Sequence, residues 1–72
     1  MKKINKIKIK LNGKFIKIQD KTTLLSLIKE LKVPIKKVAI ELNHTIVSKK
    51  SLSKIKIKNN NKVEIVHFIG GG

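Results

Sequence analysis

The sequence predicts an α+β fold, in which one main helix packs on one face of a mixed β-sheet. Three observations lead to this prediction. Apolar and polar residues alternate in several segments, only one stretch has helical periodicity, and the first two alternating segments are joined by Asn-Gly. The 72 residues are enough for one small domain, which we place at residues 1–69, followed by a flexible glycine tail at residues 70–72.

Residues 4–19 are predicted to form an antiparallel β-hairpin. Lysines alternate with apolar residues here, the pattern of a half-buried strand. The apolar positions of the shared face are Ile7, Ile9, Leu11, Ile16 and Ile18. Asn12 and Gly13 stand between the two strands, and both residue types tolerate the positive φ that a type I′ turn requires.

The only helical pattern follows the hairpin. Its apolar positions at i, i+3, i+4 and i+7 are Leu24, Leu27, Ile28 and Leu31. Thr22 or Thr23 can cap the amino end of this helix. Because a residue that precedes proline disfavours helical dihedrals, Pro34 is expected to end the helix near Lys32.

The second half of the chain returns to alternation. Residues 38–47 form two strands around an Asn43-His44 turn, and a connection follows that is anchored by Leu52, Ile55 and Ile57. Asn59, Asn60 and Asn61 mark a turn before the last strand. In that strand, Val63 and Ile65 share one face with His67, which is expected at the margin of the core. The order ββαββ suggests a ubiquitin-like β-grasp.

The net charge of +14 raises the question of a nucleic-acid-binding protein. All basic residues are lysine, however, and the only aromatic residues are Phe15 and Phe68. The arginines that read phosphates and bases are therefore missing, and so is an aromatic stacking platform. We interpret the charge as a solvated surface that would attract an acidic partner. No segment approaches the ~20 apolar residues of a membrane span.

No catalytic or metal site is expected, and no bound cofactor. Without cysteine there is no thiol nucleophile or zinc-thiolate site. The four carboxylates are scattered over different elements, at Asp20, Glu30, Glu41 and Glu64. The two histidines, His44 and His67, lie on separate elements and make a weak metal hypothesis. Acid, base and nucleophile are thus not predicted within mutual reach.

The most informative feature is the glycine tail. Gly70, Gly71 and Gly72 directly follow a strand, so they are expected to project as a thin thread that fits a narrow channel of a partner. The only reactive group at its tip is the α-carboxylate of Gly72, which ATP could activate as an acyl-adenylate. Val66 and Phe68 lie opposite the core face and form a candidate docking patch, unless the last strand is buried on both sides.

The stretches VAIELNHTIV and NNNKVEIVHFIGGG resemble the ThiS family of sulfur carriers in thiamine biosynthesis. The chain departs from the family pattern by Asn59–Asn61 in place of an acidic turn and by Ser48-Lys49 in place of Pro-Arg. The resemblance implies a β-grasp carrier rather than an enzyme. Its Gly72 would be adenylated by an E1-like enzyme of the ThiF type using ATP, and then converted to a thiocarboxylate with sulfur from a cysteine persulfide. The sulfur would pass to a ThiG-type thiazole synthase.

Three alternatives stay open. The small subunit of molybdopterin synthase and the protein-conjugating ubiquitin-like modifiers use the same kind of tail, and a small basic nucleic-acid-binding module would use the lysines instead. The composition fits the cytoplasm of a low-GC bacterium or a plastid stroma, and the chain alone is expected to be a monomer.

Overall fold

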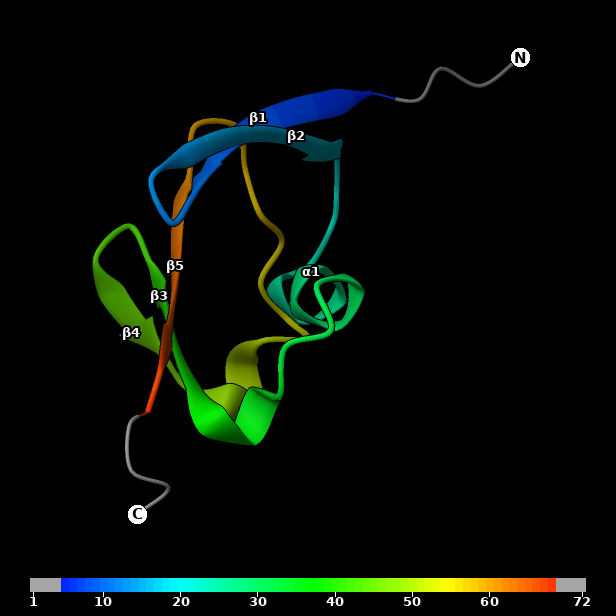
Figure 1. Ribbon diagram of the computed structural model, residues 1–72. Helices are drawn as coiled ribbons and strands as arrows, with labels where there is room; N and C mark the ends of the chain where they lie inside the picture. Colours follow the sequence, from blue (N-terminus) through cyan, green and yellow to red (C-terminus); the bar gives the residue numbers. More distant parts are fainter. Residues whose placement is uncertain (1–4, 69–72) are drawn as a thin grey trace.

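A computed structural model describes residues 5–68 of the chain (Figure 1). Its elements are β1 (Lys6–Leu11), β2 (Lys14–Gln19), α1 (Leu24–Glu30), η1 (Ile35–Lys37), β3 (Val38–Leu42), β4 (Thr45–Val47), η2 (Lys49–Ser51) and β5 (Lys62–His67), where η1 and η2 are short 3₁₀ helices. The expected tail at residues 70–72 lies outside the described residues.

The strands form one five-stranded sheet in the order β2-β1-β5-β3-β4. The central strands β1 and β5 run parallel, while the other pairs are antiparallel. The sheet is strongly twisted, and α1 lies against its concave face (Figure 1). The predicted α+β class, with a mixed sheet and one helix on one face, is therefore confirmed.

Both predicted two-residue turns are present. Asn12 and Gly13 have φ angles of 48° and 84°, and Leu11 pairs with Lys14 across them. Asn43 and His44 have φ angles of 52° and 71°. Paired positive φ values are those of type I′ turns, whose twist matches the twist of the flanking strands. The sequence pattern thus placed both hairpins correctly.

The helix α1 begins and ends with recognisable caps. The hydroxyl oxygen of Thr23, rather than that of Thr22, accepts a hydrogen bond from the Ser26 amide at 3.1 Å. At the other end Lys32 has a φ of 59°, and the Val33 amide donates to the Ile28 carbonyl at 3.3 Å. This arrangement is a Schellman motif, which normally uses glycine at the left-handed position. The predicted end near Lys32 is confirmed.

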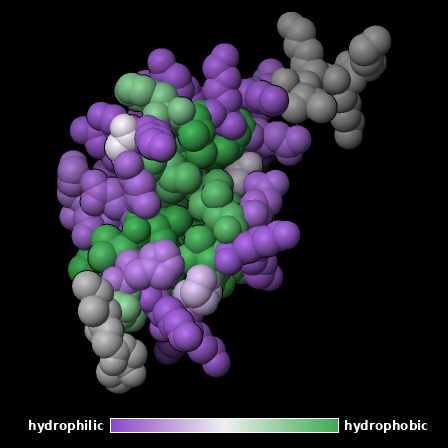
Figure 2. Space-filling view, in the orientation of Figure 1, coloured by the Kyte–Doolittle hydropathy of each residue, from purple (hydrophilic) through white to green (hydrophobic). Residues whose placement is uncertain are grey.

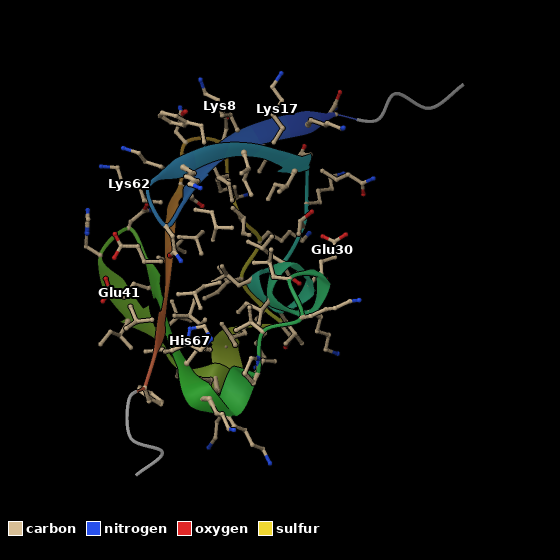
Figure 3. All side chains as sticks on the ribbon, in the orientation of Figure 1. Lys8, Lys17, Glu30, Glu41, Lys62 and His67 are labelled. Atoms are coloured by element: carbon tan, nitrogen blue, oxygen red, sulfur yellow. The ribbon has the colours of Figure 1, made fainter. Side chains whose placement is uncertain are left out.

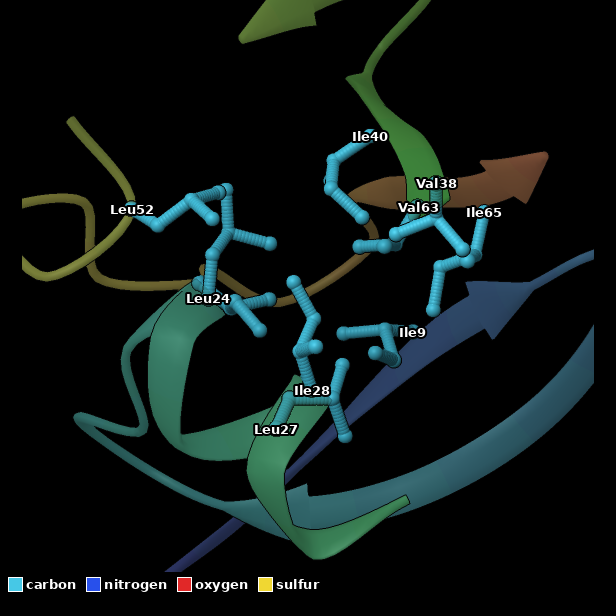
Figure 4. Close-up of a cluster of buried hydrophobic side chains, with 10 residues drawn as sticks. Ile9, Leu24, Leu27, Ile28, Val38, Ile40, Leu52, Val63 and Ile65 are labelled. Atoms are coloured by element: carbon cyan, nitrogen blue, oxygen red, sulfur yellow. The ribbon is translucent and has the colours of Figure 1, made fainter. Parts of the chain in front are cut away.

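The core lies between α1 and the sheet (Figure 4). Its buried side chains are Ile9, Leu24, Leu27, Ile28, Val38, Ile40, Leu52, Ile57, Val63 and Ile65. Leu52 and Ile57 come from the connection before β5, as predicted, and Ile55 is partly buried against them. In the described part of the chain, no helix is long and apolar enough to cross a membrane.

Two expectations about the core were wrong. Leu31 was placed on the buried helical face but is 40% exposed, because the helix ends at Glu30 and Leu31 is already its cap residue. His67 was placed at the core margin but is exposed. It follows Ile65, the last buried residue of β5, and a polar imidazole gains no free energy from burial without a partner.

Candidate functional site

The candidate site is the carboxyl end of β5, from which the glycine tail follows. The strand pairs with β3 up to the contact of His67 with Val38. One residue later, the Phe68 amide donates a hydrogen bond to the Lys37 carbonyl at 2.9 Å. The ordered sheet therefore supports the chain up to Phe68. Gly70, Gly71 and Gly72 lie outside the described residues, so their expected role stays a prediction.

Val66 and Phe68, the candidate docking patch, are 51% and 58% exposed. Val66 alternates with buried Val63 and Ile65, so it points to the face of the sheet that α1 does not cover. The alternative of a final strand buried on both sides is therefore wrong. The Lys49 ammonium nitrogen lies 5.8 Å from the centroid of the Phe68 ring, which places η2 beside the patch. Docking itself remains a prediction.

The register extends this exposed face across β3 and β4. Ala39 lies opposite Val66, and Ile46 lies opposite Glu41. Ile46 is 70% exposed, the largest exposed fraction among the large apolar side chains of the described residues. Sequence reasoning missed Ile46 as a surface residue. The signal was available, because Val47 pairs with buried Ile40 and the side chain before it must point the other way.

Glu41 and Glu64 are brought directly opposite each other on this face. The four carboxylates lie on different elements, as expected, but the fold brings two pairs of them together: Glu41 with Glu64 across β3 and β5, and Asp20 with Glu30 around the depression beside α1. Like charges directly opposite destabilise an antiparallel pair. Figure 3 shows Glu41 on the β4 side of the molecule and Glu30 beside the helix.

The described residues give no group of three or more His, Cys, Asp or Glu side chains that could hold a metal ion. His44 lies in the turn between β3 and β4, and His67 is the last residue of β5, so the two histidines belong to different parts of the fold. A shallow open depression does occur between the end of β2 and α1, lined by Lys17, Gln19, Asp20, Ser26 and Glu30 among others. None of its lining residues belongs to β5, so it is not part of the candidate site.

A side chain from the first hairpin fixes β5 from the other side. The Asn12 amide oxygen accepts a hydrogen bond from the Ile65 amide at 2.7 Å, and the Asn12 amide nitrogen donates to the Ile65 carbonyl at 3.3 Å. The Asn12 backbone amide donates to the Val63 carbonyl at 2.9 Å. Asn12 thus continues the β1–β5 ladder beyond the end of β1. A single sequence contains no signal for this contact, which joins residues 53 positions apart.

Comparison with known proteins gives consistent matches. The model of the ThiS family matches residues 4–72. The sulfur carrier protein ThiS of Bacillus subtilis is 34% identical over 65 residues, which cover 89% of this chain and 98% of that protein. A crystal structure of the thiamine biosynthesis protein ThiS from Geobacter metallireducens superposes with a TM-score of 0.82 at 26% identity, covering 92% of this chain and all of that one.

Two thiazole synthases contain a similar segment. Those of Paramagnetospirillum magneticum and Magnetococcus marinus are 39% and 38% identical to this chain over 66 residues. The match covers 92% of this chain but 20% of each synthase, so the chain spans about a fifth of their length.

Proposed function

Because this chain belongs to the ThiS family, we propose that it is a sulfur carrier in thiamine biosynthesis and that its partners carry out the catalysis. The observation that carries the proposal is the agreement of sequence and fold over nearly the whole length of two ThiS proteins. The exposed site at the end of β5 supports it, because the tail begins where the sheet provides a rigid base and an apolar surface.

The proposed chemistry takes place at the α-carboxylate of Gly72. One carboxylate oxygen attacks the α-phosphorus of ATP and pyrophosphate leaves, which gives an acyl-adenylate. A persulfide sulfur then attacks the acyl carbon and displaces AMP. A thiol cleaves the resulting acyl disulfide, so that the sulfur stays on Gly72 as a thiocarboxylate. ATP and the persulfide both belong to partner proteins, and this chain supplies the carboxylate.

The tail has to reach into a partner while the domain stays outside. From Phe68, residues 69–72 span at most about 14 Å when extended. The partner surface around the channel must therefore lie close to the end of β5. Val66 and Phe68 are the exposed apolar side chains nearest to that point in the sequence, which supports their role as the docking patch.

We propose two partners, an activating enzyme of the ThiF type and a thiazole synthase of the ThiG type. The second is supported by the two thiazole synthases that contain a segment similar to this chain. The relatives named above are all bacterial, which supports the bacterial cytoplasm over the plastid stroma as the place of action.

The family match favours the thiamine branch over the molybdopterin branch and over protein conjugation. A direct test is ATP–pyrophosphate exchange by the cognate ThiF-type enzyme. Exchange should depend on the carrier and should vanish when Gly71 and Gly72 are deleted. If exchange proceeds equally with the shortened chain, the tail is not the activated group and the proposal is overturned.

A further inference from the structure

The outer face of the β1–β2 hairpin carries a second surface that the tail chemistry does not use. The hairpin residues on this side are Lys6, Lys8, Lys10, Phe15, Lys17 and Gln19, and Lys62 of β5 lies beside them. We call Lys6, Lys8, Lys10, Phe15, Lys17 and Lys62 the lysine face. They share one side of the sheet because Lys8 pairs with Lys17, and Lys10 pairs with both Phe15 and Lys62. Figure 3 shows Lys8, Lys17 and Lys62 pointing away from α1, and Figure 2 shows hydrophilic side chains over this end of the molecule.

The lysine face concentrates positive charge at a cost in stability. Lys8 and Lys17 are directly opposite each other in an antiparallel pair, an arrangement that is destabilising for like charges. None of these six side chains is a carboxylate, but Glu64 follows Lys62 on the same side of β5, and Asp20 and Glu30 line the depression that Lys6 and Lys17 also border. A negatively charged partner surface would relieve this repulsion. The ammonium groups of the lysine face would in turn offset the free-energy cost of desolvating the partner's carboxylates.

Phe15 gives the lysine face its internal order. Its ring is 66% exposed, and the ammonium nitrogens of Lys8 and Lys10 lie 4.9 and 5.3 Å from the ring centroid. These are cation–π distances, which favour positions of the two ammonium groups over the ring. One aromatic side chain is no platform for stacking successive bases, and the chain has no arginine to read phosphates and bases. The chemistry therefore favours protein carboxylates over nucleic acid.

The lysine face is continuous with the docking patch. Lys62, Glu64 and Val66 alternate on the same side of β5, so the lysine face and the docking patch share one side of the sheet, with the Glu41–Glu64 pair between them. A protein interface of standard size covers about 800 Å² on each partner. Val66 and Phe68 together supply far less, since even a large aromatic side chain buries only about 150–250 Å². A partner that covers the patch must extend over more of the sheet.

We propose that the lysine face docks on an acidic surface of the activating enzyme, next to the channel that receives the tail. This inference rests on the proposed function. The lysine face accelerates the encounter of the two proteins, while Val66 and Phe68 retain the complex once it has formed. Long-range charge acts mainly on association rates, whereas desolvated apolar contacts act mainly on dissociation rates.

The test compares two triple variants of equal net charge. The first is Lys8→Gln, Lys10→Gln and Lys17→Gln, on the lysine face. The matched control is Lys29→Gln, Lys54→Gln and Lys56→Gln, at exposed positions on α1 and the connection before β5. Each variant carries three positive charges fewer than the starting +14. Thermal melting of both variants verifies that they fold.

The readout is the association rate constant with the cognate ThiF-type enzyme, measured by stopped flow at low and at physiological salt. We expect the lysine-face variant to associate roughly tenfold more slowly at low salt and with a weaker salt dependence, because electrostatic steering contributes factors of this order. The dissociation rate constant should change little, and the control variant should associate almost as fast as the unmodified protein.

Equal slowing by both triple variants would overturn the proposal, because net charge rather than the lysine face would then be responsible. An unchanged association rate constant for the lysine-face variant would also overturn it. So would tight binding of the unmodified protein to a 20-mer of duplex DNA or RNA at physiological salt, if the lysine-face variant loses this binding and the control variant keeps it. Thiocarboxylate formation at saturating enzyme should be equal in all three proteins. If the unmodified protein forms none, the proposed function fails, which is a different outcome from a failure of the lysine face alone.

Discussion

The amide of Phe68 donates a hydrogen bond to the carbonyl of Lys37 at 2.9 Å, and this bond is the last that ties β5 to its neighbour β3 among the described residues. Lys37 is the last residue of η1, and the next residue, Val38, is fully buried and begins β3. The bond therefore connects Phe68, from which the tail follows, to the residue directly before a core strand. The position from which the tail leaves is thereby fixed relative to the core. A carrier needs such a fixed base, because the reach of a short tail is limited.

Replacing Phe68 by glutamate should weaken the complex with the activating enzyme without unfolding the domain. Phe68 is exposed, so its replacement should change the stability of the domain little. In the complex, the glutamate carboxylate would be desolvated in an apolar contact without a partner, which lowers the affinity. We expect the dissociation constant to rise at least about tenfold, or ~1.4 kcal/mol. Titration calorimetry measures the affinity, and Leu31→Glu, at an exposed apolar position on another surface, is the control. Equal losses of affinity in both variants would count against the docking patch.

Adding a single alanine after Gly72 should abolish carrier activity and leave the fold intact. The added residue removes the glycine carboxylate from the position where the activating enzyme acts, while the core residues stay untouched. Circular dichroism and carrier-dependent pyrophosphate exchange measure the two effects separately. An alanine inserted between Met1 and Lys2, at the other end of the chain, controls for a general effect of lengthening. Full exchange activity of the extended chain would exclude the terminal carboxylate as the reacting group.

Asn12→Gly should destabilise the domain by about 1–3 kcal/mol, the usual cost when buried or half-buried polar groups lose their partners. Glycine tolerates the positive φ of this position, so the backbone is not strained. What is lost is the pair of side-chain hydrogen bonds to Ile65. Urea unfolding measures the change. A variant as stable as the unmodified protein would mean that Asn12 serves the turn alone.

Two glycine substitutions should instead stabilise the fold. Lys32 and His44 have φ angles of 59° and 71°, which cost a residue with a Cβ about 1–2 kcal/mol. Glycine removes this strain but raises the entropy of the unfolded chain, so each of Lys32→Gly and His44→Gly should gain about 0.5–1 kcal/mol. Thermal melting checks both, with Lys17→Gly in the middle of β2 as a control that should destabilise. A loss of stability at Lys32 and His44 would contradict the assigned turns.

The elements of this fold were predictable because each has a local signal. The alternation around Asn12-Gly13, the helical spacing of Leu24, Leu27 and Ile28, and the alternation in β5 depend only on residues near one another in the sequence. The exposure of Val66 followed from the same alternation. Leu31 was misplaced because periodicity does not reveal where a helix stops, and the predicted face was one residue longer than the helix.

The contacts around the site could not be predicted, because they depend on the register between distant strands. The apposition of Glu41 and Glu64, the approach of Lys49 to Phe68 and the hydrogen bonds of Asn12 to Ile65 all join segments without a common local pattern. The lysine face has the same origin. Its lysines look evenly spread in the sequence and gather on one surface only when β1, β2 and β5 lie side by side.

The decisive measurement of the carrier function is the mass of the protein after reaction. The purified chain is incubated with its cognate activating enzyme, ATP, a persulfide sulfur donor and a thiol reductant, and intact-protein mass spectrometry is followed by fragmentation. We expect the mass gain that accompanies replacement of one oxygen by sulfur, located on Gly72 and dependent on ATP. An unchanged mass with a competent enzyme, or sulfur located on any other residue, would contradict it.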